Sequence, residues 1–125
     1  MHIKGYKVIK IESFKEAEKA VKYEFSSRAS SNYILIKGKK GGKFGEHWHK
    51  GTVVSKNPEI LFLIEGKVHM ICKHVQSSEI QESDIMSPVV IEIFPNWYHT
   101  VHALSDVIFL ELTSVEDHKA DSFDM

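Results

Sequence analysis

The sequence lacks the features that would place it in an oxidising compartment, in a membrane or on nucleic acid. Cys72 is the single cysteine among 125 residues, so no disulfide can form within the chain. Sixteen basic residues stand against seventeen acidic ones and give a net charge of −1, which leaves no basic surface for nucleic acid or an anionic membrane. We therefore expect a small neutral or mixed-charge molecule as the ligand.

Long hydrophobic runs are also absent. The most apolar stretches are interrupted by Glu65, Glu92 or Asp106, and none reaches the roughly 18 residues of a transmembrane helix. Residues 1–10 lack the continuous apolar segment of a signal peptide. These absences predict a cytoplasmic protein that does not contact a membrane.

The length and the 42% hydrophobic content fit one domain with one core. Within it we expect an N-terminal strand-helix extension over residues 1–32, a barrel over residues 33–113 and a polar tail over residues 114–125. The tail, with its lone Phe123, is expected to be mobile or to lie on a partner chain.

Two different periodicities define the elements of the extension and the barrel. Alternation predicts a strand over residues 6–11. The capping-box pattern from Ser13 to Glu16, and an apolar stripe at spacings of three and four residues (Phe14, Ala17, Val21 and Phe25), predict a helix over residues 13–24 that packs on the barrel. A serine-rich loop follows over residues 26–32. Short β-rich runs then recur at 33–37, 43–49, 60–64, 68–74, 89–94, 99–103 and 107–113. Such runs predict an all-β sandwich or barrel, with a tight hairpin at Gly66.

The eight histidines are the feature of the composition that points to a functional site. His47 and His49 lie two residues apart in a predicted strand, so both imidazoles point to one side and Trp48 to the other. This arrangement is half of a metal site; the alternative is an exposed pair of solvated imidazoles.

Glu59 and His99 extend the pattern. Glu59 opens a strongly apolar strand, and its burial requires compensation by a metal ion or by an arginine or lysine. His99 follows a turn in which Asn96 suits a left-handed backbone conformation. Three histidines and a carboxylate would suit one Fe, Mn, Ni, Co or Zn ion. The alternatives are an exposed carboxylate at Glu59 and a buried, backbone-bonded imidazole at His99.

The spacing of these residues resembles the cupin family. The first cupin motif is a glycine, five residues, His-x-His, three or four residues, a glutamate, six residues and a glycine; it is matched in order by Gly41, His47, His49, Glu59 and Gly66. The second motif, a proline-glycine turn followed by a histidine, is similar to Pro95–His99 with Asn96 in place of glycine. The resemblance covers residues 33–112. It implies a cupin-type jelly-roll barrel (double-stranded β-helix) in which His47, His49, Glu59 and His99 point inward and bind one divalent transition-metal ion.

The sequence departs from the cupin pattern in two places. Nine residues separate His49 from Glu59, so the loop over residues 50–58 is long enough to displace Glu59 and leave a three-histidine site. The unchanged spacing from Glu59 to Gly66 argues against displacement. The glycine expected early in the second motif is also absent, because residues 89–92 read Val-Val-Ile-Glu.

Because side chains alternate along a strand, the position of each remaining residue predicts whether it faces into or out of the barrel. His102 should face away from His99, and the other histidines, His2, His69, His74 and His118, are expected on the surface. Phe44, Leu61 and Leu63 are expected to form an apolar wall, and Trp97 shares the side of His99. Ile60, Phe62 and Ile64 face the opposite way, so the outer face needs cover by the predicted helix or by a second subunit. We expect a homodimer.

The fold class does not determine the reaction, because cupins include dioxygenases, isomerases, epimerases, decarboxylases and sugar-sensing modules. The first hypothesis is a metal-binding cupin that acts on, or binds, a small oxygenated molecule as an oxygenase or isomerase. The alternatives are a non-catalytic sugar-binding module and a nucleotide-sugar isomerase or epimerase. The last follows from the His-Trp-His-Lys-Gly sequence, which is similar to small cupins of polysaccharide biosynthesis that use histidine and tyrosine without metal. Whether the protein is an enzyme stays open; candidate acid/base residues besides the ligands are Lys43, Tyr98, Tyr33 and Glu111.

Overall fold

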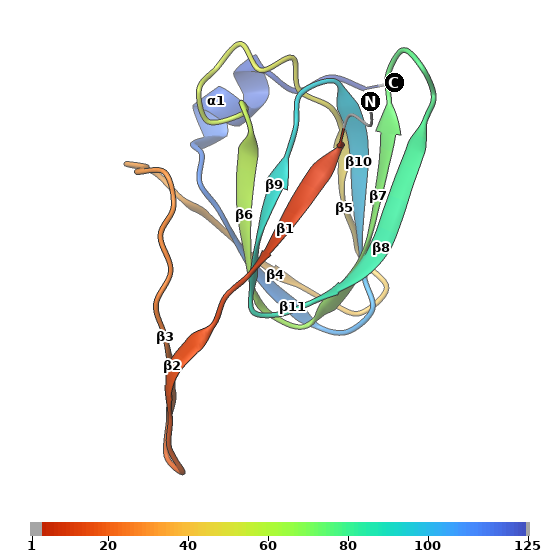
Figure 1. Ribbon diagram of the computed structural model, residues 1–125. Helices are drawn as coiled ribbons and strands as arrows, with labels where there is room; N and C mark the ends of the chain where they lie inside the picture. The colour runs from red at the N-terminus through yellow and green to blue at the C-terminus, as the bar shows by residue number, and fades with distance from the viewer. Residues whose placement is uncertain (1–3, 125) are drawn as a thin grey trace.

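The computed structural model describes residues 4–124 and consists almost entirely of antiparallel strands (Figure 1). The elements are β1 (Tyr6–Lys10), β2 (Ser13–Glu16), β3 (Val21–Tyr23), β4 (Ile34–Gly38), β5 (Lys43–His47), β6 (Glu59–Glu65), β7 (Lys67–His74), β8 (Ile80–Met86), β9 (Val89–Ile93), β10 (Trp97–Ala103), β11 (Val107–Glu111) and α1 (Val115–Ala120). A five-stranded sheet has the order β1-β9-β6-β11-β4, and a four-stranded sheet has the order β5-β10-β7-β8. The two sheets enclose a jelly-roll barrel, which confirms the predicted all-β class.

The core of the barrel lies between the two sheets because their strands alternate in burial. In β10 every second residue from Trp97 to Ala103 is buried, as expected for a strand with one face on a core. The inward side chains of both sheets form one cluster, which includes Leu63, Met70 and Ile91 without measurable exposure. β1 pairs with β9 and so belongs to the five-stranded sheet.

Strand β6 has apolar side chains on both faces, as its sequence predicts. Leu61 and Leu63 belong to the central cluster, whereas Ile60 and Phe62 belong to a second cluster with Ile11 on the outer side. The ring of Phe25 meets that of Phe62 edge-on at 5.0 Å. The outer face is therefore covered in part by the chain's own N-terminal segment.

The predicted helix over residues 13–24 is wrong. These residues form the hairpin β2–β3, which extends away from the barrel (Figure 1). Phe14 and Val21 of the expected apolar stripe are 64% and 47% exposed, so the packing that stabilises most protein helices is missing. The capping-box residues do meet, with the Ser13 hydroxyl donating to Glu16 at 3.2 Å, but they do so within a strand.

The tight hairpin predicted at Gly66 is also wrong. β6 and β7 belong to different sheets, and Gly66 forms the corner between them with a φ of +106°. A Cβ atom here would collide with the backbone oxygen of Asp106. Glycine is therefore required by the close approach of the chain at the corner.

The C-terminal residues are ordered against the barrel, in contrast to the expected mobile or partner-bound tail. Ser114 caps α1 by accepting a hydrogen bond from the backbone N–H of Asp117, and Asp121 is completely buried. Phe123 pairs with Trp48 through backbone hydrogen bonds, and their rings are 5.2 Å apart. Within residues 4–124 no helix is long and apolar enough to cross a membrane.

Candidate functional site

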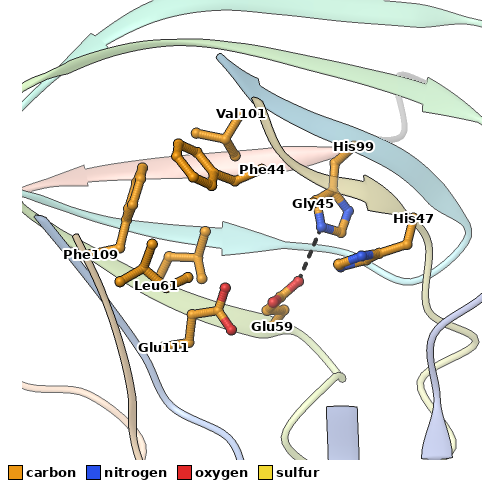
Figure 2. A pocket seen from close by; sticks show the side chains of 10 residues that line it. Phe44, Gly45, His47, Glu59, Leu61, His99, Val101, Phe109 and Glu111 are labelled. Carbon is orange, nitrogen blue, oxygen red and sulfur yellow. Dashed lines mark ion pairs between the residues drawn. The ribbon is translucent and has the colours of Figure 1, made fainter. Parts of the chain in front are cut away.

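The four predicted ligands come together at one end of the barrel. One side-chain nitrogen or oxygen from each of His47, His49, Glu59 and His99 lies within 4.8 Å of the others. Glu59 begins β6 in one sheet, and His47 and His99 form a register pair between β5 and β10 in the other. The cluster therefore combines side chains from both sheets, and Figure 2 shows three of them, His47, Glu59 and His99.

Unusual backbone conformations shape this end of the barrel. Gly45 and Glu46 have φ values of +84° and +58°, and the pairing of β5 with β10 shifts register between His99 and Thr100. A Cβ on Gly45 would lie 3.0 Å from the His99 ring. Asn96 adopts the predicted left-handed conformation, with a φ of +71°, and donates its backbone N–H to the His49 carbonyl at 2.8 Å.

His49 is oriented by the C-terminal segment. Its Nδ1 contacts the backbone carbonyl of Asp121 at 2.5 Å, so Nδ1 carries the hydrogen because a carbonyl only accepts. The Asp121 carboxylate accepts backbone hydrogen bonds from Lys50, Gly51 and Thr52 at 2.7, 2.9 and 2.7 Å. One buried residue thus fixes both His49 and the start of the long loop over residues 50–58.

Glu59 is buried and lies inside the cluster despite that loop. Its Oε2 is 2.8 Å from His49 Nε2 and 3.4 Å from His99 Nε2, and its Oε1 is 3.2 Å from Lys56 Nζ. Burial alone would raise the pKa of this carboxyl, but the His49 hydrogen bond and the nearby Lys56 ammonium help to lower it well below its ordinary value. Glu59 is therefore ionised, and the predicted compensation by a lysine is present.

Lys56 and His118 complete the surroundings of the cluster, and sequence reasoning missed both. Lys56 has no exposed surface, and its Nζ lies 3.0 Å from His118 Nδ1. Because an ammonium only donates, His118 accepts at Nδ1, so its neutral form carries the ring hydrogen on Nε2. The His118 ring is 4.8 Å from that of His47. His118 is thus half-buried beside the site, which corrects its expected place on the surface.

The remaining histidines lie apart from the cluster. His69 bonds to Asp84 and Glu82, and its register partner across the sheet is His102. The His74 ring packs edge-on against Trp97 at 5.0 Å. His2 is outside the described residues.

The imidazoles of His47 and His99 are neutral at pH 7. Burial, reinforced by the nearby His99, lowers the pKa of His47 from 6.5 to about 3. Burial likewise lowers the pKa of His99 to about 4. Neutral imidazole is the form that binds metal and the form that accepts a proton.

The hydrogen positions leave imidazole lone pairs facing a carboxylate oxygen of Glu59. His49 carries its hydrogen on Nδ1, so in its neutral form the Nε2 lone pair faces Glu59 Oε2. His99 Nδ1 points to the Trp97 carbonyl at 3.4 Å, which turns its Nε2 toward the same oxygen. A proton or a cation has to lie between these acceptors. Ligating histidines usually donate their second nitrogen to a carbonyl or carboxylate, as His49 does, so the donor set fits a divalent transition-metal ion.

A cavity adjoins the cluster on the inner side of the barrel. It is lined by Ile36, Phe44, Gly45, His47, Glu59, Leu61, His99, Val101, Phe109 and Glu111 and measures about 280 Å³ with the solvent at its mouth included. Apart from that open space, the cavity has room for about one water-sized particle. The expected apolar wall is present in Phe44 and Leu61, whereas Leu63 and Trp97 lie in the core outside the lining.

Comparison with known proteins gives structural relatives only. No protein-family model matches the chain, and no curated protein matches its sequence. A variant of the 3,4-ketoisomerase QdtA from Thermoanaerobacterium thermosaccharolyticum, in complex with TDP-4-keto-6-deoxyglucose, has 15% identity and a TM-score of 0.75 over 99% of this chain and 90% of that chain. The dTDP-4-dehydrorhamnose 3,5-epimerase of Sulfolobus tokodaii has 18% identity and a TM-score of 0.68 over 94% and 75%.

A third structure, the rmlC epimerase of Mycobacterium tuberculosis, has 12% identity and a TM-score of 0.73 over 100% of this chain and 70% of that chain. At these identities the likeness defines the fold. The chain shares a jelly-roll fold with these sugar-isomerase and epimerase structures.

Proposed function

We propose that the protein isomerises or epimerises a keto sugar carried on a nucleotide, at a site that holds one divalent metal ion. The observation that carries this proposal is the convergence of His47, Glu59 and His99 in the wall of one cavity. That cavity lies in a barrel whose shape matches a sugar 3,4-ketoisomerase over 99% of the chain.

The chemistry of such a reaction fits the groups present. Moving a carbonyl along a sugar, or inverting a carbon beside it, requires removal and return of a proton at the carbon next to the carbonyl. The site has a carboxylate and neutral imidazoles beside an apolar wall, which can bind, orient and shield the reacting end of a sugar from water. Because the inner cavity is narrow, the sugar would meet the cluster from the mouth.

His47, His49, Glu59 and His99 would hold the metal ion. The fit rests on the donor set, in which two Nε2 atoms meet one carboxylate oxygen at 2.8 and 3.4 Å. The ion would supply Lewis acidity to a carbonyl oxygen of the substrate. Lys56 occupies the other oxygen of Glu59, so the carboxylate would offer the ion a single oxygen.

The position of Lys56 supports a second candidate function, in which the same reaction proceeds without a metal ion. Its ammonium already balances the Glu59 charge inside the protein, and a proton shared between His49 and Glu59 would then take the place of the ion. In that case the histidines themselves would exchange protons with the sugar.

Incubation with TDP-4-keto-6-deoxyglucose tests the reaction directly, with product analysis by NMR. We expect a rearranged keto sugar or an inverted centre, and loss of turnover in the double variant His47→Ala/His49→Ala. The matched control is His69→Ala/His102→Ala, which removes two histidines outside the cluster. Binding of the sugar nucleotide without any turnover would instead identify a sugar-binding module. Turnover that persists after chelation and metal removal would favour the metal-free candidate.

A further inference from the structure

We infer that Glu111 is the acid/base residue that carries the proton between adjacent carbons of the sugar. This inference rests on the proposed function and assigns its proton carrier. The supporting observations are the place of Glu111 in the cavity, its lack of partners and the exclusion of the other candidates.

The topology places Glu111 on the inner face of the barrel. It is the last residue of β11 and has the same parity as the buried Val107 and Phe109. Its register partner is Leu61 of β6, two residues beyond Glu59. Figure 2 shows its side chain at the cavity, on the same side of the barrel as Glu59 and apart from the histidines. Glu111 therefore lies beside the cluster without belonging to the set of candidate ligands.

Glu111 differs from the other acidic side chains of the site in having no partner. Glu59 is bonded to His49 and Lys56, and Asp121 to three or more backbone N–H groups. Within residues 4–124, by contrast, no hydrogen bond or ion pair engages the Glu111 carboxylate. Burial, together with the negative charge of Glu59, raises the pKa of Glu111 to about 7. A carboxyl in this condition gains and loses a proton readily at neutral pH.

The acid/base candidates Lys43, Tyr33 and Tyr98 are not among the residues that line the cavity, and Tyr33 is 55% exposed. His47 and His99 do line the cavity, but together with His49 they face one another and Glu59 as the candidate metal ligands. Lys56 and His118 bond to each other and are likewise absent from the lining. Glu111 is the candidate with both access to the cavity and a free carboxylate.

The proposed step balances within the substrate. The Glu111 carboxylate takes the proton from the hydroxyl-bearing carbon next to the carbonyl, the C–H electron pair forms a carbon–carbon double bond, and the carbonyl oxygen takes a proton from solvent. The Glu111 proton exchanges with solvent, and Glu111 then delivers a proton to the former carbonyl carbon, while the neighbouring hydroxyl loses its proton to solvent and becomes the new carbonyl. No oxidant or reductant is consumed.

Incorporation of deuterium from D₂O into TDP-4-keto-6-deoxyglucose tests the inference. We expect Glu111→Gln to slow incorporation by about 100-fold or more, in the range of general acid–base effects, and Glu111→Asp to retain part of the rate. Metal content and TDP affinity should match those of wild type in both variants. The control is Glu65→Gln, which changes an exposed carboxylate at the far end of β6 and should leave incorporation unchanged.

The outcomes separate the inference from the proposed function. Rapid incorporation by both wild type and Glu111→Gln would overturn the role of Glu111 and leave the proposed function standing. An absence of incorporation and turnover in folded, metal-loaded wild type would overturn both. A rate that falls in Glu111→Gln only in proportion to lost TDP binding would also overturn the role, since it would show a binding residue.

Discussion

The Lys56 ammonium lies 3.2 Å from the Glu59 carboxylate, and neither side chain is more than 2% exposed. Lys56 belongs to the nine-residue loop that departs from the cupin spacing. The loop therefore does more than bridge His49 and Glu59, because it delivers a counter-charge to the buried carboxylate. Breaking a buried pair by removing one partner leaves an uncompensated charge and costs about 3–5 kcal/mol.

Replacing Lys56 by methionine should therefore destabilise the metal-free protein by about 3 kcal/mol, and a bound divalent ion should recover much of the loss. The reason is that the ion supplies the positive charge that Lys56 no longer provides. Urea unfolding with EDTA and with saturating Zn²⁺ measures both values, and Lys39→Met, at an exposed lysine, is the control. An equal loss with and without Zn²⁺ would show that Lys56 and the ion do not share a role.

The metal-free protein should lose stability as the pH falls from about 6.5 toward 4. The pKa of His47 is about 3 and that of His99 about 4 in the folded chain, against an ordinary value of 6.5. Between these values the unfolded chain binds protons that the folded chain does not, so the free energy of unfolding falls by up to about 1.4 kcal/mol per pH unit for each histidine. Urea unfolding in EDTA across this pH range measures the slope.

Glu111 contributes to the same curve with the opposite sign. Its pKa is about 7 in the folded chain against an ordinary 4.5, so between these values the folded chain binds the extra proton and stability declines as the pH rises. Glu111→Gln removes this contribution to the pH dependence. The free energy of unfolding should therefore fall more steeply on acidification in the variant than in wild type. A stability that is independent of pH in both proteins would contradict the burial of these groups.

Asp121→Ala should lower metal affinity although Asp121 touches no ion. Its carboxylate holds three successive backbone N–H groups of the loop, and its carbonyl fixes the His49 ring. Loss of such a supporting residue typically costs about 10- to 100-fold in metal affinity. Competition with a chromophoric chelator measures the affinity, and Asp124→Ala, at an exposed carboxylate of the same segment, should have no effect. Unchanged affinity in a folded Asp121→Ala protein would show that the C-terminal segment does not position the site.

The predicted homodimer stays a prediction that the exposed apolar side chains support. Phe14, Tyr33, Leu35 and Ile64 are 64%, 55%, 57% and 49% exposed, and a second copy of the chain could cover such side chains. Sedimentation should show a dimer at micromolar concentration, and Phe14→Ser, which changes the projecting β2–β3 hairpin, should weaken it. A monomer throughout this range would contradict the expectation.

Local spacing predicted the parts of the site that local geometry determines. The two-residue step between His47 and His49, the turn at Asn96 and the two-faced strand β6 depend on nearest neighbours and on strand parity. The turn and the two-faced strand are present in the structure, whereas β5 ends at His47, so His49 follows the predicted strand although its ring lies 4.7 Å from that of His47. The grouping of His47, His49, Glu59 and His99 as candidate ligands came from the resemblance to the cupin motifs, and the four side chains do lie together in the structure.

Contacts between distant segments could not be predicted in this way. Asp121 reaches His49 across 72 residues, and no local pattern encodes that approach. Ser114 and Asp117 did carry a capping signal for α1, and it would have placed His118 on an ordered helix. The edge strand β8 contains four consecutive polar residues, Gln81 to Asp84, so it shows no apolar alternation.

The helix expected over residues 13–24 failed for a different reason. A helical stripe is stable when it has a surface to cover, and the β2–β3 hairpin projects from the barrel with Phe14 and Val21 exposed. Without that packing, the β-branched and aromatic residues Val21 and Tyr23 favour a strand. The apolar residues have helical spacing, but the hairpin projects away from the barrel surface on which a helix would pack.

Metal content of the purified protein is the most direct test of the site. After equilibration with Fe(II), Mn(II), Co(II), Ni(II) or Zn(II) and removal of free ion, we expect about one ion per chain in wild type and in His69→Ala/His102→Ala, and none in His47→Ala/His49→Ala. Folded wild-type protein that retains none of these ions at neutral pH would contradict the metal centre formed by His47, His49, Glu59 and His99.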